Sequence, residues 1–146
     1  MKISRFEELK IWQDALKITK VIYDLSGKSK FNADFALKDQ IRRSMISVSS
    51  NIVEGFEKNN NNEFIRFLKI AKGSAGETKN QLHIAFIVGY ISKNEFQDIK
   101  IELESLSSQI GAFISYLEKA RRENKFVKTR QPVNSSTRQP VNPLTR

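Results

Sequence analysis

The sequence contains no cysteine. Its absence excludes disulfide bonds, thiolate metal ligands and cysteine nucleophiles together, and it fits a reducing compartment. Histidine occurs once, at His83, and all three prolines lie beyond residue 130. Because proline interrupts helices, residues 1–130 can form long helices without a proline break.

Long apolar runs are also missing. The segment from Met1 to Lys10 is charged and lacks the apolar core of a signal peptide. No stretch approaches the roughly 20 uncharged apolar residues that are needed to cross a bilayer. We therefore expect a cytoplasmic protein with no membrane partner.

Acidic residues are absent from the last part of the chain. Residues 124–146 hold five basic residues and no acidic one, so they supply +5 of the net charge of +9. Residues 1–123 carry the other 20 basic residues against all 16 acidic ones, which leaves a charge of +4. The body is therefore only mildly basic, and much of the charge typical of nucleic-acid binding lies in the last segment.

The last segment also contains a direct repeat. The six residues from Thr129 to Asn134 recur from Thr137 to Asn142, with a period of eight residues. A short repeat without an apolar pattern is of low complexity and does not build a core. We expect residues 124–146 to form a disordered basic tail, with a functional basic arm as the alternative.

Residues 1–123 show four long segments with apolar residues spaced by three and four positions. They predict helices from about Phe6 to Leu25, Ala33 to Phe56, Glu63 to Tyr90 and Ser92 to Arg122. Short polar breaks between long helices force successive helices to run antiparallel. The fold class is therefore all-α, an antiparallel up-down-up-down four-helix bundle that forms one domain over residues 1–123.

The helix ends carry recognisable signals. Capping boxes are predicted at three starts, Ser4 with Glu7, Asn60 with Glu63 and Ser92 with Glu95, and Asn32 is a plausible cap for the second helix. Gly73 and Gly76 lie inside the third helix, where each glycine weakens an isolated helix by roughly 1 kcal/mol. We expect them to allow the close approach of a neighbouring helix.

The first helix is apolar over two adjoining faces. One stripe holds Leu9, Trp12, Leu16, Thr19 and Tyr23, and the other holds Ile11, Ala15, Ile18, Ile22 and Leu25. One bundle core cannot bury both stripes, so the pattern predicts a contact between subunits. The outward apolar residues Ile84, Ile87 and Ile91 are expected to take part in the same contact.

Catalytic and metal-binding patterns are missing. The lone His83 has no companion base, nucleophile or metal ligand, and Asn80 stands where a bundle metal site would need an acid three residues before it. Gly73 and Gly76 lie within a helix rather than in a phosphate-binding loop. We expect no enzyme activity, no metal and no cofactor.

A polar set lies on the second and third predicted helices. Its members are Gln40, Arg43, Ser47, Asn51, Glu54, Ser74 and Glu77. Polar groups buried between helices need each other as hydrogen-bond partners. We therefore interpret the set as a structural network, with a ligand or subunit site as the alternative.

A basic set overlaps the polar one. The candidate nucleic-acid-binding residues are Arg42, Arg43, Lys58, Arg66, Lys69, Lys72 and Lys79. A solvated helix face bordered by Glu63 and Glu77 is the simpler explanation in a monomer. In a symmetric ring the same cations would repeat and their phosphate contacts would add, without any direct reading of bases.

Several of these residues form a recognisable pattern. It comprises Gln40-Ile41-Arg42-Arg43-Ser44 with Ser47, the element Asn51-Ile52-Val53-Glu54-Gly55-Phe56, the element Glu63-Phe64-Ile65-Arg66-Phe67-Leu68, and Gly73-Ser74 with Glu77. With the Ile11-Trp12-Gln13 element, the chain from Phe6 to about Leu117 resembles the small four-helix-bundle proteins encoded by intervening sequences in bacterial large-subunit ribosomal RNA genes. Val53 replaces the alanine usual in the motif, and the repeated tail lies outside the resemblance.

The resemblance implies a bacterial, cytoplasmic protein that assembles into a homopentamer. It also implies kinship with the accessory protein of diversity-generating retroelements, a basic barrel that works with nucleic acid. Our leading hypothesis is a non-enzymatic homo-oligomer that binds structured RNA or DNA through a basic surface. The alternative is a scaffold whose partner is another protein, with no nucleic-acid role.

Overall fold

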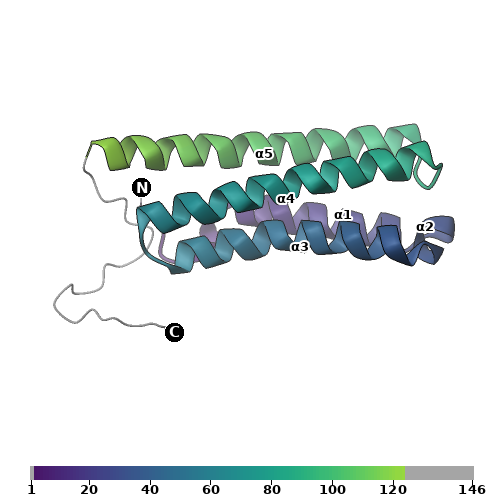
Figure 1. Ribbon diagram of the computed structural model, residues 1–146, viewed down its shortest axis with the longest axis horizontal. Coiled ribbons are helices and arrows are strands. Elements are labelled where there is room, and N and C mark those ends of the chain that lie inside the picture. Colours follow the sequence, from purple (N-terminus) through teal and green to yellow (C-terminus); the bar gives the residue numbers. More distant parts are fainter. Residues whose placement is uncertain (1, 124–146) are drawn as a thin grey trace.

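Four long helices run alternately up and down in the computed structural model (Figure 1), which describes residues 2–123. The elements are η1 (Phe6–Glu8), α1 (Lys10–Ser26), α2 (Ser29–Ala33), α3 (Phe35–Glu57), α4 (Asn61–Ile87) and α5 (Lys93–Arg122). No strand occurs over residues 2–123. The predicted all-α up-down-up-down bundle is confirmed, whereas the prediction for residues 124–146 lies outside the described residues.

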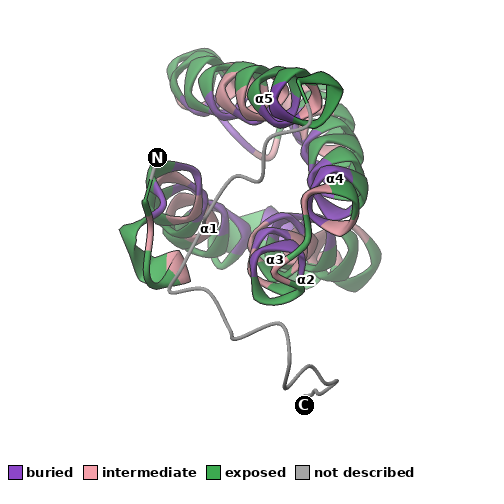
Figure 2. Cartoon of the chain, turned by 90° about the vertical axis from the view of Figure 1, so that its left-hand side faces the viewer, coloured by how far each residue is buried: buried purple, intermediate pink, exposed green. Residues whose placement is uncertain are grey.

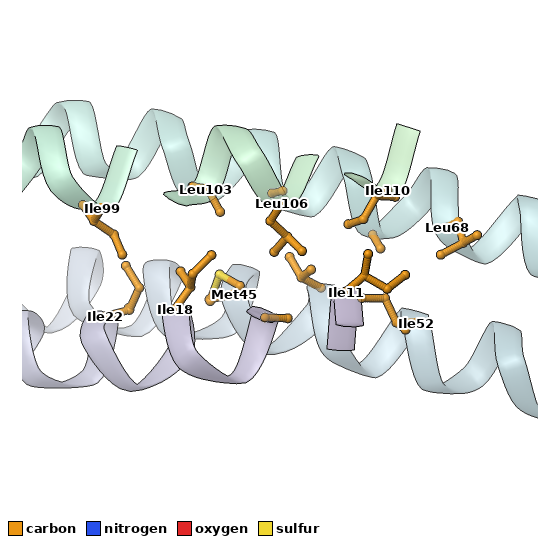
Figure 3. Close-up of a cluster of buried hydrophobic side chains, with 14 of the residues drawn as sticks. Ile11, Ile18, Ile22, Met45, Ile52, Leu68, Ile99, Leu103, Leu106 and Ile110 are labelled. Carbon is orange, nitrogen blue, oxygen red and sulfur yellow. The ribbon is translucent and has the colours of Figure 1, made fainter. Parts of the chain in front are cut away.

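The core lies along the axis of the bundle, and each long helix contributes one apolar stripe to it. Figure 3 shows Ile18, Met45, Leu106 and Leu68, from α1, α3, α5 and α4, among the side chains that line the space between the helices, and each is at most 2% exposed. Burying one such side chain contributes roughly 1.5–3 kcal/mol to folding. The bundle is therefore held mainly by apolar contacts between helices that are far apart in sequence.

Only one of the two predicted stripes of the first helix is buried in this core along its whole length. Ile11 and Ile22 are buried, whereas Leu16 and Tyr23 remain 42% and 39% exposed. The prediction for Ile91 is wrong, because this side chain is 6% exposed and belongs to the core, so it cannot reach another subunit. In the other stripe, Leu9 is 3% exposed and belongs to the core, whereas Leu16 and Tyr23 lie on the surface.

Two predicted helix starts are confirmed. The Ser92 side chain accepts a hydrogen bond from the Glu95 N–H at 3.0 Å, and the Glu95 carboxylate accepts one from the Ser92 N–H at 2.8 Å. The Asn60 side chain accepts a hydrogen bond from the Glu63 N–H at 3.0 Å. These bonds satisfy amide groups that a helix leaves unpaired in its first turn.

The other two helix starts differ from the prediction. The Ser4 N–H donates to Glu8 rather than forming a box with Glu7, and α1 begins at Lys10 after the 3-10 turn η1. Asp34, not Asn32, caps α3 by accepting from the Leu37 N–H at 3.1 Å. The reason is that residues 29–33 form the separate short helix α2, which moves the start of α3 beyond Asn32.

The predicted role of Gly73 and Gly76 is also wrong within this chain. A Cβ atom added at either position would meet nothing within 4 Å, because both residues face outward. The close approach occurs instead at Gly55 on α3, where an added Cβ would lie 2.8 Å from the Cβ of Phe67 on α4. Gly55 therefore sets how closely α3 and α4 can pack.

Candidate functional site

Hydroxyl groups bind α3 to α4 along a polar line beside the core. The Oγ of Ser44 lies 2.7 Å from the Oγ1 of Thr78 and donates to Gln81 at 2.7 Å. One helical turn later, the Oγ atoms of Ser47 and Ser74 lie 2.8 Å apart. Ser44 and Thr78 are buried, so these bonds satisfy groups that would otherwise be costly to remove from water.

The structure brings together three members of the predicted polar set. Asn51 donates to the backbone carbonyl and the hydroxyl of Ser47, at 2.8 and 3.0 Å, and Ser47 contacts Ser74. The remaining members, which lie on the exposed edge beside the line, are Gln40, Arg43, Glu54 and Glu77.

Arg43 forms its ion pair within α3, and no hydrogen bond joins it to the polar line in the described residues. Its guanidinium donates to Asp39 at 2.8 Å, one turn away, and this contact raises the pKa of Arg43.

Sequence reasoning missed Ser44, Thr78 and Gln81. A signal was present: Thr78 and Gln81 continue the face of Ser74 at helical spacing, and Ser44 precedes Ser47 by three positions. The missing information was the register between α3 and α4, because that register decides which hydroxyl groups meet.

Arg42 lies at the junction of α1 and α3. Its Nε donates to the Ser26 Oγ at 2.8 Å and its Nη2 to the Tyr23 carbonyl at 3.3 Å, while the guanidinium lies 4.2 Å from the centre of the Tyr23 ring. A cation here satisfies a carbonyl at the end of α1 and complements the helix dipole. Arg42 therefore holds the end of α1 against α3.

Two further candidate cations meet at the turn between α3 and α4. Lys58 and Arg66 lie 5.8 and 4.4 Å from the centre of the Phe67 ring. Arg66 also pairs with Glu63 at 3.1 Å, and this hydrogen bond raises the pKa of Arg66 and lowers that of Glu63. Arg66 is thus fixed by a carboxylate and a ring, whereas Lys58 is exposed.

The other three candidates lie along the boundary between α4 and α5. Lys69 pairs with Glu118 at 3.5 Å, and the side chain of Lys72 passes over Gly111. Lys79 forms an ion pair with Glu104 on α5 at 2.6 Å.

Lys100 approaches the same carboxylate to 3.4 Å, and the two lysines, Lys79 foremost, lower the pKa of Glu104. We call Lys69, Lys72, Lys79 and Lys100 the α4/α5 basic face. It carries four cations against the two carboxylates of Glu104 and Glu118.

An apolar surface lies along the boundary between α1 and α3. Its members are Trp12, Leu16, Tyr23, Phe35 and Ile46, and we call it the α1/α3 apolar face. The stacking of Arg42 on Tyr23 shows that the two helices meet there. Leu16 precedes Tyr23 by two helical turns, and Phe35 and Ile46 stand two turns before and one turn after Arg42, so all point to one side. Phe35 is 73% exposed.

Side chains able to bind a metal do not gather in the described residues. No group of three His, Asp or Glu side chains able to hold a metal occurs over residues 2–123. His83 is exposed and packs edge-on against Phe96, with ring centres 4.8 Å apart. In that part of the chain, no helix is long and apolar enough to cross a bilayer.

Comparison with known proteins places the chain in a family. No curated protein matches it. A solved structure of a protein of unknown function from the S23 ribosomal protein family of Bacteroides thetaiotaomicron VPI-5482 shares the fold, with a TM-score of 0.66 and 23% sequence identity. The match covers 71% of this chain and 97% of that one. The family model of the 23S rRNA-intervening sequence protein matches residues 7–112, and the chain therefore belongs to that family.

Proposed function

We propose that the protein is a non-enzymatic homo-oligomer, a pentamer by family resemblance, that binds structured RNA or DNA through the α4/α5 basic face. The observation that carries the proposal is the position of two surfaces. The α1/α3 apolar face and the α4/α5 basic face lie on opposite sides of the bundle (Figure 2). A subunit that packs through the first surface leaves the second surface open.

The α1/α3 apolar face supports the assembly. Leu16, Tyr23, Phe35 and Ile46 are each between 39% and 73% exposed, although they are large and apolar. Apolar residues that gather on one exposed surface favour contact with another protein. Ile84 and Ile87 on α4 are also exposed, at 41% and 79%, and offer further apolar area.

The α4/α5 basic face supports the binding of a polyanion. Lys72 makes no salt bridge within the described residues, and Glu104 is shared by Lys79 and Lys100. Positive charge is therefore left over along the boundary of α4 and α5. A ring repeats this charge in each subunit, and each phosphate contact then adds to affinity and to its salt dependence.

The test measures mass and binding on the full chain. Light scattering gives the solution mass, and titration of labelled structured RNA and duplex DNA at several salt concentrations gives the affinity and its salt slope. Lys72→Glu should weaken binding to both nucleic acids and reduce the salt slope by about one for each phosphate that the variant no longer binds. Lys17→Glu is the matched control, because it makes the same charge change on the exposed side of α1.

A second candidate function is a protein-interaction scaffold. It is favoured because several candidate cations already have an acidic partner in the chain: Arg43 has Asp39, Arg66 has Glu63, Lys69 has Glu118 and Lys79 has Glu104. An oligomer that binds neither RNA nor DNA at low salt would support this function over the first. A stable monomer in solution would overturn the proposed assembly.

A further inference from the structure

A third surface lies along the boundary between α3 and α4. It is lined by Arg43, Ser47, Glu54, Ile70, Gly73, Glu77 and Ile84, and we call it the α3/α4 face. The contact of Ser47 with Ser74 fixes the register of the two helices here. Ile70 and Ile84 stand two helical turns before and after Glu77, so the three side chains point to the same side of α4.

The α3/α4 face carries acidic groups outside any salt bridge. Glu54 and Glu77 are exposed, and neither forms a salt bridge in the part of the chain that the structure describes. The arginines near this face are already paired, Arg43 with Asp39 and Arg66 with Glu63. The surplus charge of the α3/α4 face is therefore negative.

The α1/α3 apolar face has the opposite surplus. Lys38 lies 4.9 Å from the centre of the Phe35 ring and donates to Asn32, and Arg42 lies over Tyr23. Among residues 2–123, no carboxylate forms a salt bridge with either cation. The α1/α3 apolar face thus combines exposed apolar side chains with positive charge that no carboxylate neutralises.

We infer that the α1/α3 apolar face of one copy packs against the α3/α4 face of the next copy. This inference rests on the proposed assembly and specifies its contact. Pairing like faces would bring Lys38 and Arg42 near their own copies, or Glu77 near a second Glu77, whereas pairing unlike faces brings opposite charges together.

The shape of the α3/α4 face fits the same pairing. The exposed Ile70 and Ile84, each at least 41% exposed, provide apolar area for the large side chains of the neighbouring face. Between them, the open space at Gly73 leaves room for a side chain such as Leu16 or Phe35. A contact between two different faces repeats from copy to copy and closes into a ring when the rotation allows.

The test uses two variants of the full chain that each damage one face. Leu16→Glu places a charge on the α1/α3 apolar face, and the double change Ile70→Glu with Ile84→Glu does so on the α3/α4 face. All three positions are at least 41% exposed, so both variants should fold, and circular dichroism checks this. We expect each variant alone to be a monomer, and an equimolar mixture to form a dimer with one copy of each.

The outcomes separate this inference from the proposed function. If either variant alone assembles like the unchanged protein, or if the mixture stays monomeric, the pairing of unlike faces is wrong while the assembly itself stands. If the unchanged protein is a monomer, the proposed assembly fails first. A dimer that appears only in the mixture is expected from one intact contact between two different faces, and not from two like faces.

Discussion

Gly55 on α3 faces Phe67 on α4 so closely that a methyl group at Gly55 would lie 2.8 Å from the Phe67 Cβ and 3.0 Å from the Phe64 ring. Both contacts are with parts of the neighbouring helix that cannot easily move, because Phe64 and Phe67 are buried. The glycine of the Asn-Ile-x-Glu-Gly element thus has a packing role.

Gly55→Ala should destabilise the fold. Alanine favours a helix over glycine by roughly 1 kcal/mol, but overpacking a core contact costs about 1–3 kcal/mol, and the second effect should be larger. Urea unfolding followed by circular dichroism measures the change. An unchanged or higher midpoint would mean that α3 and α4 can separate without cost.

Gly73→Ala is the matched control, with the opposite sign. The position is helical and exposed, and a Cβ there meets nothing within 4 Å in the chain. Under conditions where the protein is monomeric, the substitution should raise the free energy of unfolding by about 0.5–1 kcal/mol. A loss of stability in the monomer would contradict this account of the site.

Ser44→Ala should cost about 1–2 kcal/mol of stability, because it removes a buried hydroxyl that bonds to both Thr78 and Gln81. Ser49→Ala is the control: its hydroxyl donates only to the Ile46 carbonyl of its own helix, so the change should be close to neutral. Equal effects of the two substitutions would show that the contact across the helices adds nothing.

Stability should fall at acid pH partly through Asp34. The hydrogen bonds from the Leu37 N–H and the Tyr90 hydroxyl lower the pKa of Asp34 below its ordinary value of 3.8. A lowered pKa in the folded state gives stability that is present above the unfolded value and is lost as the pH falls through the folded one. Urea midpoints between pH 6 and pH 2 should therefore fall less in Asp34→Asn than in the unchanged protein.

Arg42→Ala should separate a structural cation from a binding one. The substitution removes the contacts with Ser26 and Tyr23 and should lower stability. Where light scattering gives the same solution mass as for the unchanged protein, the affinity of the folded variant for RNA and DNA should be unchanged. Lys72→Glu should lower the affinity for RNA and DNA and leave the stability unchanged. If Arg42→Ala weakens binding without changing stability, Arg42 belongs to the nucleic-acid surface after all.

Much of the fold could be predicted because the signals for it are local. The spacing of Phe96, Ile99, Leu103 and Leu106 defines α5, and the box of Ser92 with Glu95 marks its start. The start of α1 did not follow from the capping signal, because the 3-10 turn η1, in which the Leu9 N–H donates to the Phe6 carbonyl, comes first and α1 begins only at Lys10. The sequence also indicates that α1 has two apolar stripes, and the structure reveals which one the core takes.

The candidate site was less predictable, because it depends on contacts between helices. The sequence identifies Arg42 and Lys79 as cations, but only the packing of α3 on α1 and α4 on α5 gives them Ser26 and Glu104 as partners. Likewise, Gly73 and Gly55 look equivalent as helical glycines. Their neighbours differ because one faces outward and the other faces α4.

The carboxylate of Glu104, which Lys79 and Lys100 share, affects the conformational entropy that a ligand of the α4/α5 basic face would have to remove. Lys79 and Lys100 are both drawn to it, so two flexible side chains are partly ordered before a ligand arrives. Ordering such a side chain on binding costs about 0.5–1.5 kcal/mol. For these two lysines, folding has already met part of that cost, so an anion that spanned both of them would bind with a smaller loss of side-chain entropy.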